Sequence, residues 1–127
     1  TGNSLSGDPG FLGKLAQLEI NALAMETSEQ RVLANLGAGN RPGSVSSVLN
    51  AISAETLQKA DELAIEIAAY YGLPYQPEAL EVGGPSPIGS KITLPLMPSY
   101  MNNRMRTIAG GSAEIQRNIV AKAILEL

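Results

Sequence analysis

The chain has 127 residues, of which 44% are apolar, so it is long enough for one hydrophobic core and too short for several. Its 9 basic and 12 acidic residues give a net charge of −3, which excludes the basic surface typical of nucleic-acid-binding proteins. Cysteine and histidine are both absent, which excludes thiol nucleophiles, disulfides, histidine bases and the usual zinc sites. We therefore expect no metal site, and any chemistry must use carboxylates, backbone groups or a cofactor.

No apolar run approaches the length of a membrane span, because Glu62 and Glu66 interrupt the longest one. The sequence also lacks an amino-terminal basic segment followed by an apolar one, the pattern of a secretion signal. These features predict a soluble, cytoplasmic protein without a membrane span.

The first predicted element is a long helix over residues 9–37, preceded by a loose polar segment at 1–7. Asp8 is the expected N-cap, and Pro9 stands at the first helical position, where its missing N–H does least harm. Apolar residues recur at helical spacing until Gly37 ends the helix. The helix is predicted to pack on two sides, because further apolar residues lie outside the main stripe, namely Leu12, Ile20 and Leu23.

A short turn over residues 37–43 leads to a second long helix, which begins after Pro42 with Ser44 as its expected cap. Gly72 and the nearby Pro74 end this helix. Helices of about 28 residues are roughly 42 Å long and, with so short a connection, are expected to pair antiparallel.

Residues 73–96 are rich in proline and glycine and predict a long connection without a regular element, apart from a possible short extended piece at 91–94. A short helix follows at residues 98–106. Its Arg104 and Arg106 could hold a carboxylate or a phosphate, but surface or intrachain ion pairs are the favoured interpretation.

The last stretch, residues 107–127, contains two glycines, a serine and then an uninterrupted helical pattern. Gly110 and Gly111 allow a sharp turn, and Ser112 can cap the helix that follows. Such a helix N-terminus suits a carboxylate, a phosphate or a ring edge, although an ordinary junction of two helices would show the same spacing. One predicted apolar stripe of this helix consists of Ile115, Ile119, Ala123 and Leu127.

The motif G-G-S-A-E-I-Q-R-N-I-V-A at residues 110–121 closely resembles the carboxy-terminal signature of the acyl-CoA dehydrogenase family. R-P-G-S-V-S-S-V-L-N at 41–50 looks like the start of the preceding long helix of that family, and D-P-x-F at 8–11 is similar to its upstream run. The resemblance implies an all-α, up-and-down helical bundle. It also implies that residues 1–127 are a carboxy-terminal domain without the amino-terminal helical and middle β domains of the family.

The resemblance further implies FAD as cofactor, an acyl-CoA thioester as substrate, an electron-transfer flavoprotein as partner and a role in fatty acid metabolism. In the family a carboxylate removes the α-proton while a hydride passes from Cβ to the flavin. Ser112 and Glu114 fall on FAD-contacting positions, and Gly111 falls where the backbone approaches the substrate. For Glu114 an equally good interpretation is that an acidic residue in the first helical turn favours the helix dipole.

The glutamate base of many family members stands where this chain has Gly110, so we expect no catalytic base within this chain. Some members place that glutamate on an earlier helix, and the isolated chain is therefore predicted to be inactive. The resemblance also implies homo- or hetero-oligomers. Two alternatives remain open: a non-catalytic assembly domain of the same fold, and a flavin oxidase or monooxygenase relative.

Overall fold

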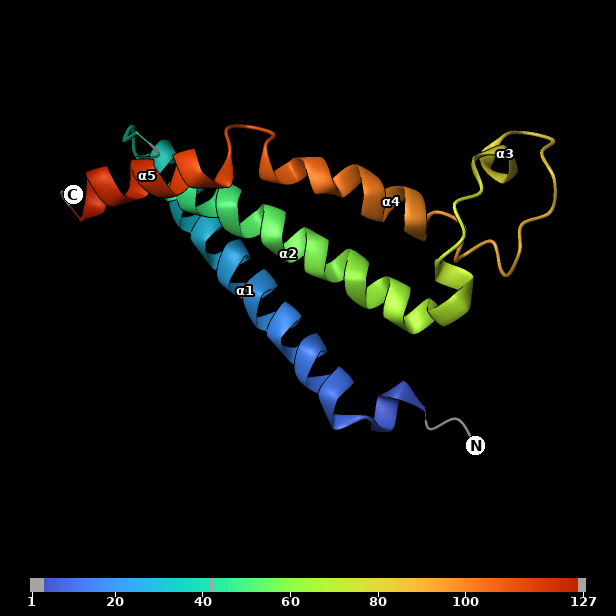
Figure 1. Cartoon of the computed structure of the whole chain (residues 1–127). Coiled ribbons are helices and arrows are strands. Elements are labelled where there is room, and N and C mark those ends of the chain that lie inside the picture. The colour runs from blue at the N-terminus through green and yellow to red at the C-terminus, as the bar shows by residue number, and fades with distance from the viewer. Residues whose placement is uncertain (1–3, 42, 126–127) are drawn as a thin grey trace. The chain divides into compact units, whose positions relative to one another are not determined.

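The structure is a computed structural model that describes residues 4–41 and 43–125 (Figure 1). Every regular element in this part of the chain is a helix, and these residues contain no strand. The all-α prediction is therefore confirmed, and the expected extended piece at 91–94 is wrong because these residues form turns. Within the described residues, no helix is both long enough and apolar enough to cross a membrane.

The first long helix, α1, spans Pro9–Gly37 and has the predicted bounds. The carboxylate oxygen Oδ1 of Asp8 accepts hydrogen bonds from the backbone N–H of Gly10 at 2.7 Å and of Phe11 at 3.0 Å. Both donors belong to the first turn and have no partner inside the helix, so Asp8 is the N-cap that the sequence predicts.

The segment before α1 is more ordered than the sequence suggests. Leu5–Gly7 forms a 3-10 turn, in which the N–H of Gly7 donates to the carbonyl of Ser4 at 2.9 Å. The prediction of a loose segment is therefore wrong for these three residues, and residues 1–3 lie outside the described part of the chain.

The second long helix, α2, spans Val45–Ala68 and begins directly after Ser44. Pro42, which the sequence places at the entry to this helix, lies outside the described residues. The α-helix ends at Ala68, four residues before the predicted stop at Gly72, because Ala69 has a left-handed backbone with φ +49°. A separate 3-10 helix then spans Ala69–Gly72.

The chain forms two compact units, each of which includes part of α1 and part of α2. The first unit contains the described residues of Thr1–Leu15 and Leu57–Arg104, and the second those of Ala16–Thr56 and Met105–Leu127.

In the first unit, the helix α4 over Leu96–Asn103 lies along the second half of α2 (Figure 1). The amide of Gln58 donates to the carbonyl of Asn103 at 3.0 Å, and Arg104 pairs with Glu62 at 3.2 Å. Near the other end of this contact, Met97 and Ile65 line a common pocket. The two helices are therefore antiparallel.

The pair between Arg104 and Glu62 confirms that Arg104 is engaged within the chain. Lys14 in α1 pairs with Glu66 in α2 at 2.8 Å in the same unit. Residues early in α1 thus meet residues late in α2, which is the antiparallel order expected for the two long helices.

The proline- and glycine-rich connection contains one short helix, α3, over Pro77–Leu80. A Cβ at Gly84 would lie 2.0 Å from the carbonyl oxygen of Glu78, so only glycine fits this close backbone approach. A Cβ at Gly89 would lie 2.8 Å from the ring of Tyr71. Local packing therefore accounts for glycine at these two positions.

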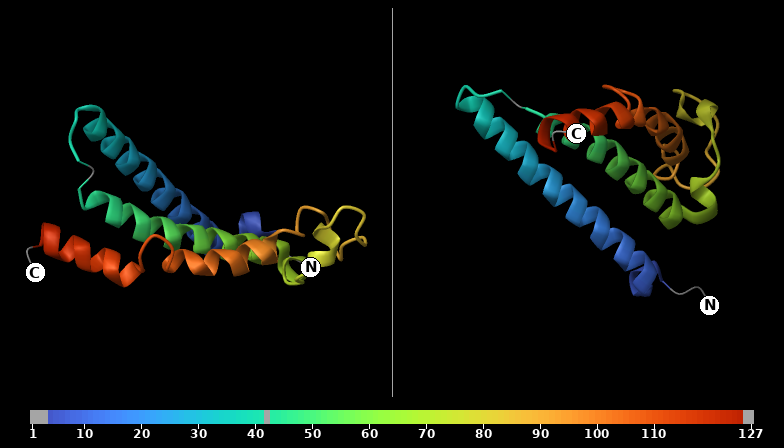
Figure 2. Two further views of the ribbon diagram at one scale, coloured as in Figure 1. Left: turned by 90° about the horizontal axis from the view of Figure 1, so that it is seen from above. Right: turned by 60° about the vertical axis from the view of Figure 1, so that its left-hand side comes forward.

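In the second unit, α5 over Ala113–Ile124 runs beside the first half of α2 in each view (Figure 2). Arg117 of α5 forms an ion pair with Glu55 of α2. An apolar groove between the two helices has a volume of 270 Å³ and is lined mainly by Val48, Ala51, Ile52, Val120, Ala121 and Leu125. Leu127, the last residue of the predicted stripe, lies outside the described residues.

The hydrophobic core is small. Its buried apolar residues are Phe11, Ala51, Ala54, Leu63, Leu94 and Ala113. By contrast, the second side of α1 is uncovered, with exposed fractions of 44% for Leu12, 59% for Ile20 and 63% for Leu23. The prediction that α1 packs on two sides is therefore wrong within the described part of this chain, where its neighbours cover one side.

Candidate functional site

The candidate site is the turn that leads into α5, and its shape depends on two glycines. Gly110 has φ +78° and Gly111 has φ +100°, which is backbone that residues with a side chain rarely adopt. The N–H of Gly111 donates to the carbonyl of Ile108 at 3.2 Å and closes the turn. The sharp turn predicted from the glycine pair is confirmed.

Ser112 follows the turn and is the N-cap of α5. Its backbone is extended, and its hydroxyl oxygen accepts from the N–H of Ile115 at 3.4 Å. The sequence prediction of this cap is confirmed. The cap places the Ser112 hydroxyl and the positive end of the helix dipole directly after the glycine pair.

A buried glutamine holds the turn from the side of α5. Gln116 is 8% exposed, and its amide nitrogen Nε2 donates to the carbonyl oxygen of Gly110 at 2.7 Å. A Cβ at Gly111 would lie 2.7 Å from the same nitrogen. The turn therefore has no room for a side chain at Gly111 while this hydrogen bond is formed.

A second amide lies on the side of α2. The nitrogen Nδ2 of Asn50 would be 2.6 Å from a Cβ built on Gly110. Sequence reasoning missed both Asn50 and Gln116. For Gln116 a signal was available, because a glutamine one helical turn after a cap residue can reach back to the loop before it. For Asn50, which is 60 positions before Gly110, no local pattern exists.

Glu114 lies in the first turn of α5 with its carboxylate exposed to solvent. Hydrogen bonds from its own backbone N–H and from the Ser112 hydroxyl, together with the charge of Arg117, hold the pKa of Glu114 below its usual value. The carboxylate is therefore charged at neutral pH and suited to accept hydrogen bonds rather than to take up a proton.

Residues 1–125 match the family described as acyl-CoA dehydrogenase, C-terminal domain. The chain belongs to this family. Searches of curated proteins and of solved structures found no match for it. The family resemblance inferred from the motif around Gly110 and Gly111 is thus confirmed.

The turn at residues 108–112 contains no carboxylate. Glu114 is the nearest acidic residue in sequence, but it lies past the turn on α5. Among the described residues, no cluster of acidic side chains could hold a metal ion.

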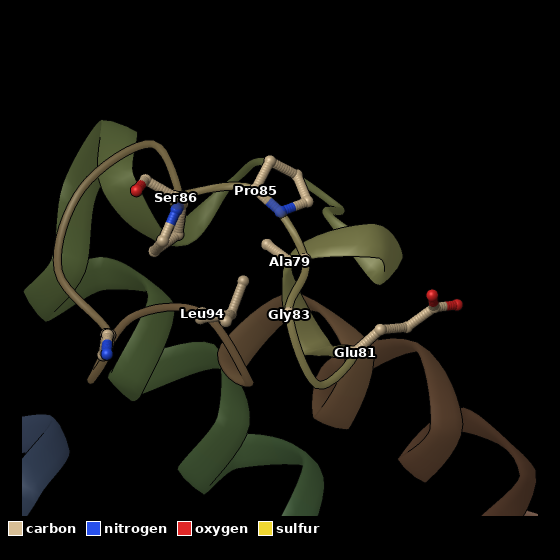
Figure 3. A pocket seen from close by; sticks show the side chains of 9 residues that line it. Ala79, Glu81, Gly83, Pro85, Ser86 and Leu94 are labelled. Carbon is tan, nitrogen blue, oxygen red and sulfur yellow. The ribbon is translucent and has the colours of Figure 1, made fainter.

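A second hollow in this acyl-CoA dehydrogenase domain lies within the proline- and glycine-rich connection and has a volume of 330 Å³ (Figure 3). Ala79 and Leu94 point into it, whereas the carboxylate of Glu81 and the hydroxyl of Ser86 point away. Lys91 is a further lining residue of this hollow. The turn into α5 combines two glycines of positive φ with a capped helix N-terminus, so it is the better candidate for binding and chemistry.

Proposed function

We propose that this chain is the carboxy-terminal domain of an FAD-dependent acyl-CoA dehydrogenase-like oxidoreductase that desaturates the α,β bond of an acyl-CoA thioester. The observation that carries the proposal is the turn at Gly110 and Gly111, which leads into a capped helix N-terminus within a chain of this family. The remainder of the enzyme, an amino-terminal helical domain and a middle β domain, would lie outside residues 1–127.

The turn has the features that one edge of a flavin site requires. Gly110 and Gly111 carry no side chain, so a planar ring could approach their backbone closely. Ser112 and Glu114 supply a hydroxyl and a charged carboxylate on the first turn of α5, and we assign both to FAD binding. When bound, FAD would supply the acceptor for the hydride that leaves the substrate.

Gly111 would form part of the substrate wall next to the thioester. This chain would supply the wall and not the base, since glycine at position 110 has no proton acceptor and an unassisted serine hydroxyl at 112 is a poor one. A carboxylate from outside residues 1–127 would remove the α-proton.

The uncovered apolar residues of α1 fit a domain that meets other subunits or domains, and an electron-transfer flavoprotein would take the electrons. A domain with an incomplete site would bind FAD weakly alone, and we expect the isolated chain to be inactive. We place the protein in the cytoplasm and in fatty acid metabolism.

The first test is the absorbance spectrum of the purified full-length protein, followed by addition of butyryl-, octanoyl- or palmitoyl-CoA without oxygen. A flavin spectrum that bleaches with an acyl-CoA supports the proposal. Absence of flavin would instead favour a non-catalytic assembly domain, and flavin that no acyl-CoA bleaches would favour an oxidase or monooxygenase relative.

The second test concerns the base and compares three variants of the full-length protein. Replacing any candidate glutamate that precedes residue 1 on an earlier helix by glutamine should abolish turnover. Glu114→Gln should retain turnover when FAD is supplied at a saturating concentration, because its expected role is to bind the cofactor and not to take up the proton. Gly110→Glu is then made in the protein that lacks the upstream glutamate, and recovery of turnover would show that position 110 can carry the base. The assignment is wrong if Glu114→Gln abolishes turnover with flavin retained while the upstream change does not.

A further inference from the structure

The peptide group between Gly110 and Gly111 is held at both of its polar ends. Its carbonyl oxygen accepts from Gln116 Nε2 at 2.7 Å, and its N–H donates to the carbonyl of Ile108 at 3.2 Å. Two successive glycines are the most freely rotating pair a chain can contain. A fixed orientation of this peptide therefore depends on its hydrogen bonds and not on side-chain sterics.

Of these two bonds, the one from Gln116 is the better placed to fix the turn. Gln116 is 8% exposed, so water competes little for the donor, although Gly110 itself is exposed and the bond as a whole is part-buried. A hydrogen bond from a buried donor is stronger than one between two exposed groups. The backbone N–H of Gln116 also donates to the carbonyl of Ser112 at 2.9 Å. The donor is thus anchored in the same helix turn that presents Ser112.

The turn is also bounded on its other side by Asn50 of α2, whose Nδ2 lies 2.6 Å from the position of a Cβ on Gly110. Asn50 limits the space beside Gly110, and Gln116 limits the space beside Gly111. Of these two residues, Gln116 is the one that donates a hydrogen bond to the turn.

We propose that Gln116 is a positioning residue, whose amide fixes the plane of the Gly110–Gly111 peptide so that the turn presents one backbone edge to the acyl-CoA thioester. The role of the turn as a substrate wall rests on the proposed function. The fixing of the turn by Gln116 rests on the geometry alone, so the two can be tested apart.

The test uses the full-length protein with Gln116→Met and Gln116→Glu. Methionine has a similar length and no donor. An ionised glutamate places a negative oxygen against the Gly110 carbonyl, but a protonated one has an O–H that can donate to it. Burial raises the pKa of a carboxyl group, so the glutamate variant should regain the bond toward roughly pH 5 and lose it toward roughly pH 8.

Gln58 offers a matched control. Its amide donates to the carbonyl of Asn103 at 3.0 Å, which is the same type of hydrogen bond in the other compact unit. Gln58→Met removes that bond, and Gln58→Glu removes it when the carboxyl group is ionised; neither substitution changes a residue of the turn. The charged groups on α5 and the facing part of α2, namely Glu55, Glu114, Arg117 and Lys122, are unchanged in all variants. We therefore divide each variant's exchange rate and KM by the wild-type value at the same pH, which removes the pH dependence that these groups cause in both proteins.

The first measurement is backbone hydrogen exchange by mass spectrometry over residues 105–115. Gln116→Met should speed exchange there, because the Gly111 N–H is protected only while the turn is closed, and Gln58→Met should not. Exchange as slow as in the wild-type protein would overturn the inference. This measurement needs no substrate. It therefore tests whether Gln116 fixes the turn even if the protein shows no acyl-CoA chemistry and the proposed function fails.

The second measurement is the steady-state KM and kcat with octanoyl-CoA and a dye as electron acceptor. One neutral hydrogen bond corresponds to about a fivefold effect, so Gln116→Met should raise KM by about fivefold with flavin content retained. The KM of Gln116→Glu should match that of the wild-type protein near roughly pH 5 and approach that of Gln116→Met near roughly pH 8. If exchange speeds up while KM is unchanged at both pH values, or if Gln58→Glu shows the same pH dependence, Gln116 does not position the substrate.

Discussion

At the scale of single residues, the turn into α5 requires that position 111 carry no side chain. An alanine there would have φ near +100° and would place its Cβ 2.7 Å from Gln116 Nε2. That nitrogen donates a hydrogen bond to the Gly110 carbonyl oxygen. The added methyl group would therefore break this hydrogen bond as well as strain the backbone. We expect Gly111→Ala to lower the free energy of unfolding by about 2–3 kcal/mol, as measured by urea denaturation.

Gly13→Ala is the control for this change. Gly13 lies within α1 and has no positive φ, and a Cβ added there would meet no other atom within 4 Å. Alanine should therefore raise the free energy of unfolding by about 0.5–1 kcal/mol. Equal effects of the two substitutions would show that the turn is not constrained as described.

A further residue-scale prediction separates the two interpretations of Glu114. Hydrogen bonds to its carboxylate lower its pKa, so its stabilising effect is present at neutral pH and is lost as pH falls through the lowered pKa. Glu114→Gln should therefore melt below the wild-type protein at neutral pH, and the two melting temperatures should converge well below the usual pKa of 4.5. If FAD affinity is unchanged in this variant, Glu114 serves the helix and not the cofactor.

At the scale of elements, the residue after the end of α2 has a backbone conformation that is unfavourable for its residue type. Ala69 has φ +49°, the left-handed conformation that usually ends a helix at glycine. Ala69→Gly removes a steric cost of about 1–2 kcal/mol but adds about 0.4–1 kcal/mol of unfolded-state entropy. We expect a net gain in the free energy of unfolding of about 0.5 kcal/mol by urea denaturation.

The neighbouring Ala68 is the matched control, because it has φ −75° and ψ −14° in the right-handed region. Glycine there has no strain to relieve and should cost about 1 kcal/mol. A loss of stability in both variants would contradict the strained conformation of Ala69.

Some bounds of the elements can be predicted from neighbouring residues alone, and others cannot. The bounds of α1 follow from Asp8 and Gly37, each of which acts on its own helix end, so sequence alone predicts them. The turns at residues 91–94 were harder to predict, because a short β-prone run is extended only where a partner strand exists, and the described part of the chain has none.

At the scale of the whole molecule, we predict that the isolated chain self-associates. Large apolar side chains are exposed on several helices, with 63% of Leu23, 60% of Leu33, 85% of Tyr70 and 56% of Ile115 accessible. Water-exposed apolar area of this extent favours association. Light scattering at tens of micromolar should report a mass above that of one chain, and a clean monomer that binds no apolar dye would contradict the prediction.

Two substitutions on α1 refine that experiment. Leu23→Lys replaces an exposed apolar side chain by a charge and should weaken association, whereas Gln30→Lys adds the same charge at an exposed polar position. Similar weakening by both variants would indicate a general effect of charge and not loss of an apolar contact.

Short-range patterns in the sequence determined the helical class, the caps Asp8 and Ser112, the turn at Gly110 and Gly111, and the family. Each depends on residues a few positions apart, and their stereochemistry is the same in any fold. Only the tertiary structure decided that Asn50, distant in sequence, lies against Gly110, and that one side of α1 is uncovered. Both depend on how helices pack across long separations in sequence, which periodicity along one helix cannot specify.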